Sequence, residues 1–142
     1  MLEYDRQKEI VRYLASDSRV ILAFLFGSFA KDRARSSSDL DIAVYLASPY
    51  LDQDVADIWN HLEDISHRDV DLIVLNDAPP GISWTAMRGR ILVDKNPKLR
   101  LELMLAKSRE AEDFREFQMD FLRERSRHWG KKHVQPISRA DQ

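Results

Sequence analysis

A run of seven apolar residues, from Val20 to Phe26 (VILAFLF), constrains the fold of this chain most strongly. Its length, and the glycine at position 27 that ends it, favour a β-strand over a helix. A strand with no polar side chain on either face is buried on both faces. The run therefore predicts an inner strand of a sheet that has other elements packed against both of its sides.

The rest of the chain alternates between helical and strand patterns. Apolar residues at helical spacing predict helices, and alternating or short apolar runs predict strands. In chain order the expected elements are a helix over 2–16, strand 20–26, a short helix over 29–35, strand 39–46, helix 51–65, strand 70–75, helix 82–87, strand 91–93 and a helix from 98 to about 127. Strands that alternate with helices predict an α/β or α+β domain.

The length of 142 residues suits one domain. We expect a core over residues 1–96, a helical segment over 97–130 packed on the core or on a partner, and a tail over 131–142. The chain has no cysteine, which excludes disulfides, thiolate zinc sites and a cysteine nucleophile. No apolar run reaches the roughly 18 residues that span a bilayer, and the charged N-terminus does not resemble a signal peptide. We therefore expect a cytoplasmic protein that does not bind membranes.

The formal net charge of −2 argues against a protein built mainly to bind nucleic acid. The charge is spread unevenly, because the segment 97–142 is basic and the preceding residues are acidic. A basic terminal segment is more often a solvated helix end than a binding surface. We therefore expect no direct binding of nucleic acid.

Aspartates inside the predicted strands are the most unusual feature of the sequence. Side chains two residues apart in a strand share a face, so Asp39 and Asp41 lie side by side, opposite the apolar face of strand 39–46. Asp71 lies in strand 70–75 on the face opposite its valines and leucine. Aspartate is depleted in strands, and such conflicts with local preference are expected at functional sites.

A hard divalent cation would stabilise three carboxylates that lie close together. Mg²⁺ prefers oxygen ligands and is usually bound by a few carboxylates together with substrate phosphates. Two such ions can stabilise the attacking and the leaving oxygen of a displacement at phosphorus. The alternative is structural, with Asp39 as a strand-entry residue and Asp41 as a partly exposed surface residue.

A glycine and a serine, Gly27 and Ser28, follow the buried strand and precede the predicted helix over 29–35. Backbone N–H groups at the start of a helix can bind phosphate, and glycine lets the backbone approach closely. The serine hydroxyl can add a hydrogen bond to a phosphate oxygen. The alternative is a plain strand-to-helix turn in which Ser28 caps the helix.

The Gly27-Ser28 turn and the Asp39 and Asp41 pair together resemble the motif of a known protein family. The segment GSFAKDRARSSSDLDIAV, from Gly27 onward, resembles the signature of the nucleotidyltransferase superfamily that includes DNA polymerase β and kanamycin nucleotidyltransferase. The resemblance covers residues 20–75, and the short length resembles that of minimal nucleotidyltransferase antitoxins of HEPN toxins. It implies the DNA polymerase β-like fold, a small mixed sheet flanked by helices, with a long C-terminal helical segment.

The resemblance also implies roles for the residues of the motif. Asp39, Asp41 and Asp71 would be the catalytic carboxylates and would hold two Mg²⁺ ions. Asp71 would in addition help to deprotonate the acceptor hydroxyl. The acceptor oxygen would then attack the α-phosphate of ATP and release pyrophosphate. In the antitoxin branch, AMP is transferred to a tyrosine of a cognate HEPN ribonuclease toxin, which silences the toxin.

The phosphate-binding part of the motif departs from the family pattern. Gly27 and Ser28 would bind the β- and γ-phosphates, and Lys31 stands where many relatives have arginine. Lysine keeps the positive charge but lacks the fork of a guanidinium. Asp32 replaces a glycine and adds a negative charge near the phosphates. Both changes bear on nucleotide affinity and leave the three carboxylates intact.

Two alternative functions remain open from the sequence. One is a catalytically silent antitoxin that neutralises its toxin by binding alone. The other is a nucleotidyltransferase for a small molecule such as an aminoglycoside, although 142 residues leave little room for a substrate domain. The complete set of motif residues argues against the silent antitoxin, and the short length argues against the small-molecule transferase.

Overall fold

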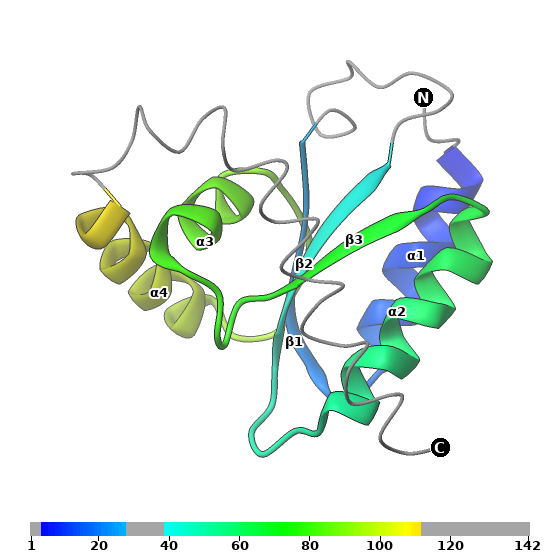
Figure 1. Cartoon of the computed structure of the whole chain (residues 1–142), viewed down its shortest axis with the longest axis horizontal. Helices are drawn as coiled ribbons and strands as arrows, with labels where there is room; N and C mark the ends of the chain where they lie inside the picture. The colour runs from blue at the N-terminus through cyan, green and yellow to red at the C-terminus, as the bar shows by residue number, and fades with distance from the viewer. Residues whose placement is uncertain (1–3, 28–38, 112–142) are drawn as a thin grey trace.

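The computed structural model of the chain describes residues 4–27 and 39–111 (Figure 1). The helix expected over 29–35 and every position beyond 111 lie outside the described residues. The elements are α1 (Tyr4–Ser16), β1 (Val20–Phe26), β2 (Leu40–Leu46), α2 (Asp52–Ser66), β3 (Val70–Val74), α3 (Pro80–Met87), β4 (Arg90–Asp94) and α4 (Pro97–Ala111).

The strands and helices expected within the described residues are all present, with ends that differ by one or two residues. The α/β fold class is therefore confirmed. α3 begins at Pro80, two residues earlier than expected, because proline has no N–H to lose in a first helical turn. α4 begins at Pro97, where the C-terminal helical segment is expected to begin.

The four strands form one mixed sheet in the order β3-β2-β1-β4. β1 is antiparallel to both of its neighbours, β2 and β4, whereas β2 and β3 are parallel. α1 and α2 cover one face of the sheet, and α3 and α4 lie on the other (Figure 1). β1 is therefore the covered inner strand that its apolar run predicts.

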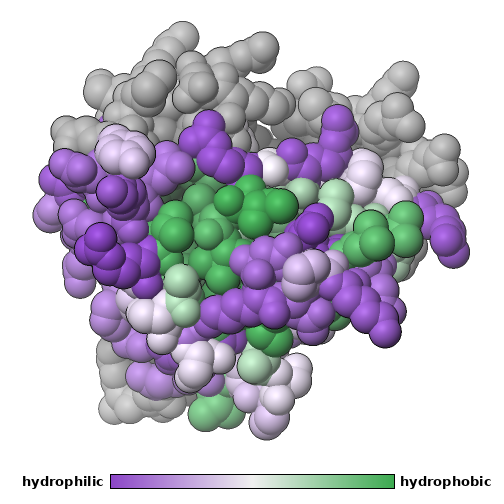
Figure 2. Space-filling model, turned by 180° about the vertical axis from the view of Figure 1, so that it is seen from behind, coloured by the Kyte–Doolittle hydropathy of each residue, from purple (hydrophilic) through white to green (hydrophobic). Residues whose placement is uncertain are grey.

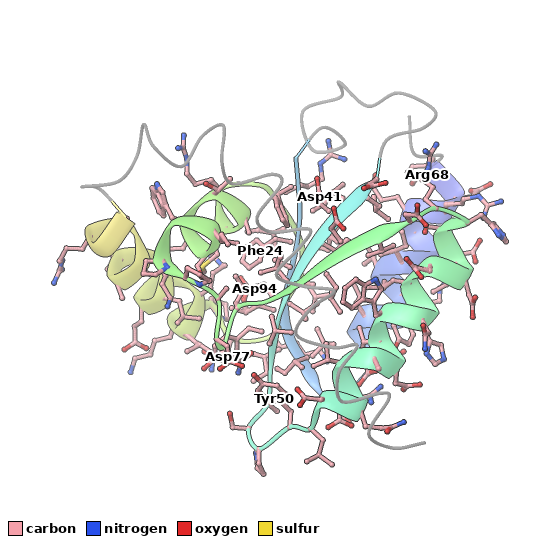
Figure 3. The ribbon with its side chains drawn as sticks, viewed as in Figure 1. Phe24, Asp41, Tyr50, Arg68, Asp77 and Asp94 are labelled. Atoms are coloured by element: carbon pink, nitrogen blue, oxygen red, sulfur yellow. The ribbon has the colours of Figure 1, made fainter. Side chains whose placement is uncertain are left out.

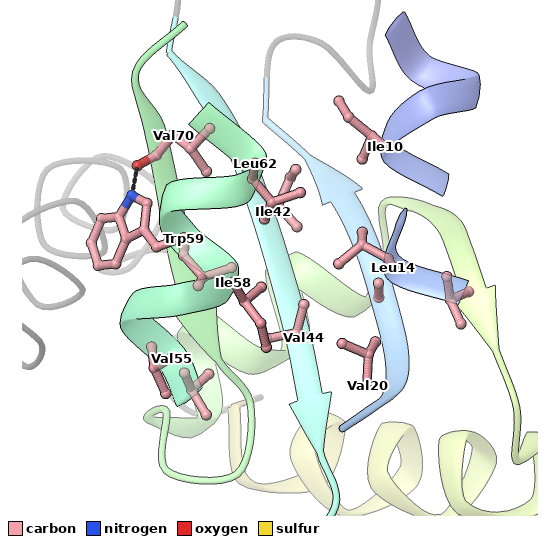
Figure 4. Packing of buried hydrophobic residues seen from close by; sticks show 14 of the residues in the cluster. Ile10, Leu14, Val20, Ile42, Val44, Val55, Ile58, Trp59, Leu62 and Val70 are labelled. Carbon is pink, nitrogen blue, oxygen red and sulfur yellow. Dashed lines mark hydrogen bonds between the residues drawn. The ribbon is translucent and has the colours of Figure 1, made fainter. Parts of the chain in front are cut away.

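A separate apolar core lies on each face of the sheet. The core under α1 and α2 includes Ile42 and Val44 of β2 together with Ile58 and Leu62 of α2 (Figure 4). Trp59 belongs to this core, and its indole Nε1 donates a hydrogen bond of 2.7 Å to the carbonyl oxygen of Val70. This bond satisfies a buried polar group and fixes α2 against the first residue of β3.

The core under α3 and α4 uses the opposite side chains of the same strands. It contains Phe24 of β1, Ala43 of β2 and Ile73 of β3, packed against Ile82 and Ala86 of α3. α4 packs mainly on α3 and adds partly buried side chains to this core. The alternation of faces along β2 and β3 therefore sends their apolar residues to one core or the other.

An arginine holds three carboxylates at the end of the sheet where β1 begins. Arg19, just before β1, forms ion pairs with Asp17 at 2.6 Å, with Asp57 at 2.9 Å and with Asp54 at 3.2 Å. Its hydrogen bonds lower the pKa of the Asp17 carboxyl to about 2. This Arg19 cluster (Asp17, Arg19, Asp54 and Asp57) fastens the start of β1 to the first turns of α2.

The molecular surface is largely hydrophilic, with an apolar area visible from behind (Figure 2). Among the described residues, the large apolar side chains that are exposed include Ile91 on the edge strand β4 and Leu101 and Leu105 on α4. No helix in the described ranges has both the length and the apolar character that crossing a membrane requires.

Candidate functional site

The register of β2 and β3 brings two aspartates together. Asp41 of β2 lies directly opposite Asp71 of β3 in the parallel ladder. Neighbouring strands are about 4.8 Å apart, so the two side chains leave the sheet next to each other. The two strands that carry these aspartates are therefore neighbours in the sheet.

Both aspartates lie on the α3 face of the sheet and are largely enclosed by protein. Asp41 is 8% exposed and Asp71 is 2% exposed. Their side chains share the face of Ala43 and Ile73, which belong to the core under α3 and α4. Figure 3 shows Asp41 near the end of the sheet where β2 begins. Two carboxylates on one face at this depth are costly for the fold because like charges repel.

Asp39 lies one residue before β2 begins and is half-buried. The backbone next to it is held by the hydrogen bond that the N–H of Leu40 donates to the carbonyl oxygen of Asp69, at 2.9 Å. Asp39 is therefore placed at the amino end of β2, two residues before Asp41. The structure thus brings two of the three predicted carboxylates into direct register and the third to the same end of the sheet.

Gly27 meets Asp41 at this end of the sheet. Its φ is +74°, in the left-handed region that residues with a Cβ avoid. A Cβ at this position would overlap Oδ2 of Asp41, and it would also come within 3.1 Å of Cγ. The space that the glycine leaves is therefore filled by the carboxylate. Phe26, the preceding residue, pairs with Asp41 across the β1–β2 ladder.

Two of the predicted phosphate-binding residues cannot be placed. Ser28 and Lys31 lie outside the described residues, so their assignment remains a prediction. The backbone that leads into them is placed, since Gly27 is the last described residue after β1. The predicted phosphate-binding segment therefore starts beside Asp41.

The turn between α3 and β4 also lies at this end of the sheet, although no motif in the sequence indicates it. A Cβ on Gly89 would meet the carbonyl oxygen of Leu25 and would come within 3.0 Å of the Cβ of Phe26. The glycine thus lets the turn rest on the last residues of β1. Its signal in the sequence is weak, because a lone glycine after a helix is common in any turn.

Trp59 and Trp84 differ in their burial and surroundings. Trp59 is a core residue. Trp84 is half-buried on α3. The Arg88 guanidinium carbon lies 5.6 Å from the centroid of the Trp84 ring. Trp84 therefore carries a cation on its face.

The donor set at this end suits a hard divalent cation. Asp39, Asp41 and Asp71 offer only carboxylate oxygens, the ligands that Mg²⁺ prefers. Among the described residues, no three His, Cys, Asp or Glu side chains gather closely enough to form a metal cluster by themselves. Mg²⁺ sites usually use one or two carboxylates and complete their shell with water and substrate phosphates. The adjacent pair of Asp41 and Asp71 fits that pattern.

Solved structures share this fold. A chain of a crystal structure described as a toxin–antitoxin with AMP-PNP is 17% identical, with a TM-score of 0.63; the match covers 84% of this chain and 95% of the other. A chain of a structure described as the tri-AMPylated Shewanella oneidensis HEPN toxin in complex with MNT antitoxin is also 17% identical, with a TM-score of 0.59; the match covers 87% of this chain and 98% of the other. A structure described provisionally as a minimal nucleotidyltransferase is 26% identical, with a TM-score of 0.53, covering 61% and 88%.

The sequence comparisons give the family. No curated protein sequence matches the chain significantly. The sequence model of the family described as polymerase beta, nucleotidyltransferase matches residues 8–98, which is more than half of the chain. The matched region includes all four strands, Gly27 and the three aspartates. This chain belongs to the polymerase beta nucleotidyltransferase family.

Proposed function

We propose that this protein is a nucleotidyltransferase antitoxin that uses Mg²⁺ to transfer AMP from ATP to a tyrosine hydroxyl of a cognate HEPN ribonuclease toxin. The transfer neutralises the toxin. The observation that carries the proposal is the direct register of Asp41 with Asp71 beside Gly27. Two matched structures support the substrate and the partner, since one contains AMP-PNP and another a tri-AMPylated HEPN toxin with its antitoxin.

The carboxylates have distinct roles in this reaction. Asp39, Asp41 and Asp71 would hold two Mg²⁺ ions. Bound Mg²⁺ supplies positive charge that offsets the charge of the triphosphate and of the leaving pyrophosphate. Because Asp41 and Asp71 project from adjacent strands of a covered sheet, their positions are fixed before substrate binds. This preorganisation is what electrostatic stabilisation of a phosphoryl transfer requires.

The residues of the chain also orient the substrates. The backbone at Gly27 and the hydroxyl of Ser28 donate hydrogen bonds to the β- and γ-phosphates, with Lys31 adding positive charge. The Asp71 carboxylate accepts the proton of the tyrosine hydroxyl. The tyrosine oxygen forms a bond to the α-phosphorus, the bond from that phosphorus to the bridging oxygen breaks, and pyrophosphate leaves with the electron pair.

A transfer assay tests the proposal. The purified protein is incubated with the product of its neighbouring gene, Mg²⁺ and α-labelled ATP. The test variant is the double substitution Asp39→Asn and Asp41→Asn. The control is Asp54→Asn with Asp57→Asn, which removes the same charge from the Arg19 cluster at the other end of the sheet.

We expect label on the partner with the wild-type protein and the control, and none with the test variant. Mass spectrometry then locates the acceptor residue. If the wild-type protein transfers no label and the test variant still protects cells from the partner, the protein acts by binding alone. Label found on an added aminoglycoside instead of the partner would identify a small-molecule transferase.

A further inference from the structure

Arg88 lies on the turn that rests against the end of β1. It caps the C-terminus of α3, and the next residue is Gly89. The close approach of Gly89 to Leu25 and Phe26 fixes this turn at the point where β1 leads into Gly27. Arg88 is therefore one residue from a backbone contact with the strand that delivers the predicted phosphate-binding segment.

Two arginines flank Gly89, and they lie on different faces of the sheet. Arg90 pairs with Leu25 in the β1–β4 ladder, and its Nη1 donates a hydrogen bond of 3.3 Å to Oε1 of Gln7 on α1. Arg90 is therefore held on the α1 face. Arg88 instead lies over Trp84 of α3, on the face that carries Asp41 and Asp71.

The surroundings of Arg88 leave its charge available. Among the described residues, the guanidiniums of Arg19 and Arg100 each contact carboxylates, at 2.6 Å and 2.7 Å, whereas no Asp or Glu forms an ion pair with Arg88. The Trp84 ring stabilises the cation from one side. A guanidinium has five N–H donors in a fixed plane, and Arg88 is exposed.

We infer that Arg88, held by Trp84, binds the triphosphate of the nucleotide at the Asp41–Asp71 site; the inference rests on the proposed function. A planar guanidinium matches the oxygens of phosphate and can donate two parallel hydrogen bonds. The carboxylates on the same face repel a triphosphate, so an arginine on that face offsets part of the repulsion. Arg88 thereby supplies the fork that Lys31 lacks.

Nucleotide binding tests the inference without any need for turnover. The dissociation constants of a non-hydrolysable ATP analogue and of AMP are measured by calorimetry in Mg²⁺ for the wild-type protein, Arg88→Gln and Arg90→Gln. Arg90→Gln is the matched control, because it removes the same charge from the same turn on the other face. We expect Arg88→Gln to weaken binding of the ATP analogue about tenfold, in keeping with the loss of one charge-assisted contact.

Further measurements separate binding from structure. Arg90→Gln should change the affinity for the ATP analogue less than twofold, and Arg88→Gln should leave AMP affinity and the thermal midpoint unchanged. Trp84→Leu should weaken binding of the ATP analogue less than Arg88→Gln, because the charge stays but its support is lost. Equal affinity of wild type and Arg88→Gln, or equal losses in Arg88→Gln and Arg90→Gln, would overturn the inference. If the wild-type protein binds neither nucleotide, the proposed function itself fails.

Discussion

The two ends of the sheet each carry three aspartates, and the arrangement of charge around them differs. At the end where β1 begins, Asp17, Asp54 and Asp57 surround Arg19, and each forms an ion pair with it. At the end where β1 finishes, the strand register places Asp41 against Asp71. The first arrangement joins opposite charges and stabilises the fold. The second puts like charges side by side on a largely buried face.

This difference fits the proposed function, in which the substrate or an ion uses only the charge of the Asp41–Asp71 pair. The Arg19 cluster supplies its own counter-charge from within the chain, so it needs no ligand. The Asp41–Asp71 pair lies on a largely buried face of the sheet, where two adjacent carboxylates contribute least to the stability of the fold. Such an arrangement is typical of a site whose charge is used by a substrate or an ion. Changes at the two ends should therefore have opposite consequences for stability and for activity.

The largest effect is expected from Asp71→Asn. It keeps the shape of the side chain, removes one of two like charges, and should lower the transfer rate by about 100- to 1,000-fold. The free energy of unfolding should rise by about 0.5–1 kcal/mol, because the repulsion with Asp41 is relieved. Urea denaturation and the transfer assay measure the two effects on one preparation. A variant that keeps full activity would show that the two ends do not differ in function.

A smaller effect is expected from Arg19→Ala, and it should be on stability alone. Removal of the guanidinium leaves three carboxylates facing one another, which should lower the free energy of unfolding by about 2 kcal/mol. Urea denaturation gives the value, and the transfer rate of the folded protein should stay within twofold. Asp57→Asn is the graded control: this carboxylate is 47% exposed, so its loss should cost less than about 0.5 kcal/mol.

The smallest effect concerns pH. The Arg19 contacts lower the pKa of Asp17 from 3.8 to about 2, so the folded protein binds fewer protons than the unfolded chain between these values. The contribution of Asp17 is therefore fully present above about pH 4 and is lost as the pH falls toward 2. It amounts to about 1–2 kcal/mol. Unfolding measured from pH 5 to pH 2 should show this loss in the wild-type protein, and Asp17→Asn should show a correspondingly shallower one.

Much of the fold follows from local patterns in the sequence. The apolar run of β1 predicts a covered inner strand, and the helical spacing over 51–65 predicts α2, because in both the buried face is decided by neighbouring residues. The parallel pairing of β2 with β3 and the outer position of β4 depend on contacts between distant segments. Local periodicity therefore carries no signal for them, and the mixed sheet was expected only through the resemblance.

The placement of some candidate-site residues also follows from the sequence. Asp41 and Asp71 stand out because charged residues interrupt strand patterns, and the structure places them side by side. The sequence gives no signal for the place of Gly89, since the reason for a glycine there is the backbone of Leu25, more than sixty residues away. A lone arginine after a helix has no distinctive pattern either. Such residues are recognised only when the strand they approach is known.

Because Gly27 and Asp41 fit closely together, the substitutions that evolution can accept at one position depend on the residue at the other. While Asp41 is present, any side chain at position 27 collides with it. If Asp41 were replaced by a smaller residue, that collision would disappear, and position 27 could accept asparagine, which tolerates a positive φ. Restoring the aspartate alone would then recreate the collision. A lineage that lost its carboxylate in this order would have to restore the glycine at position 27 before the aspartate at position 41, so the path back would be longer than the path out.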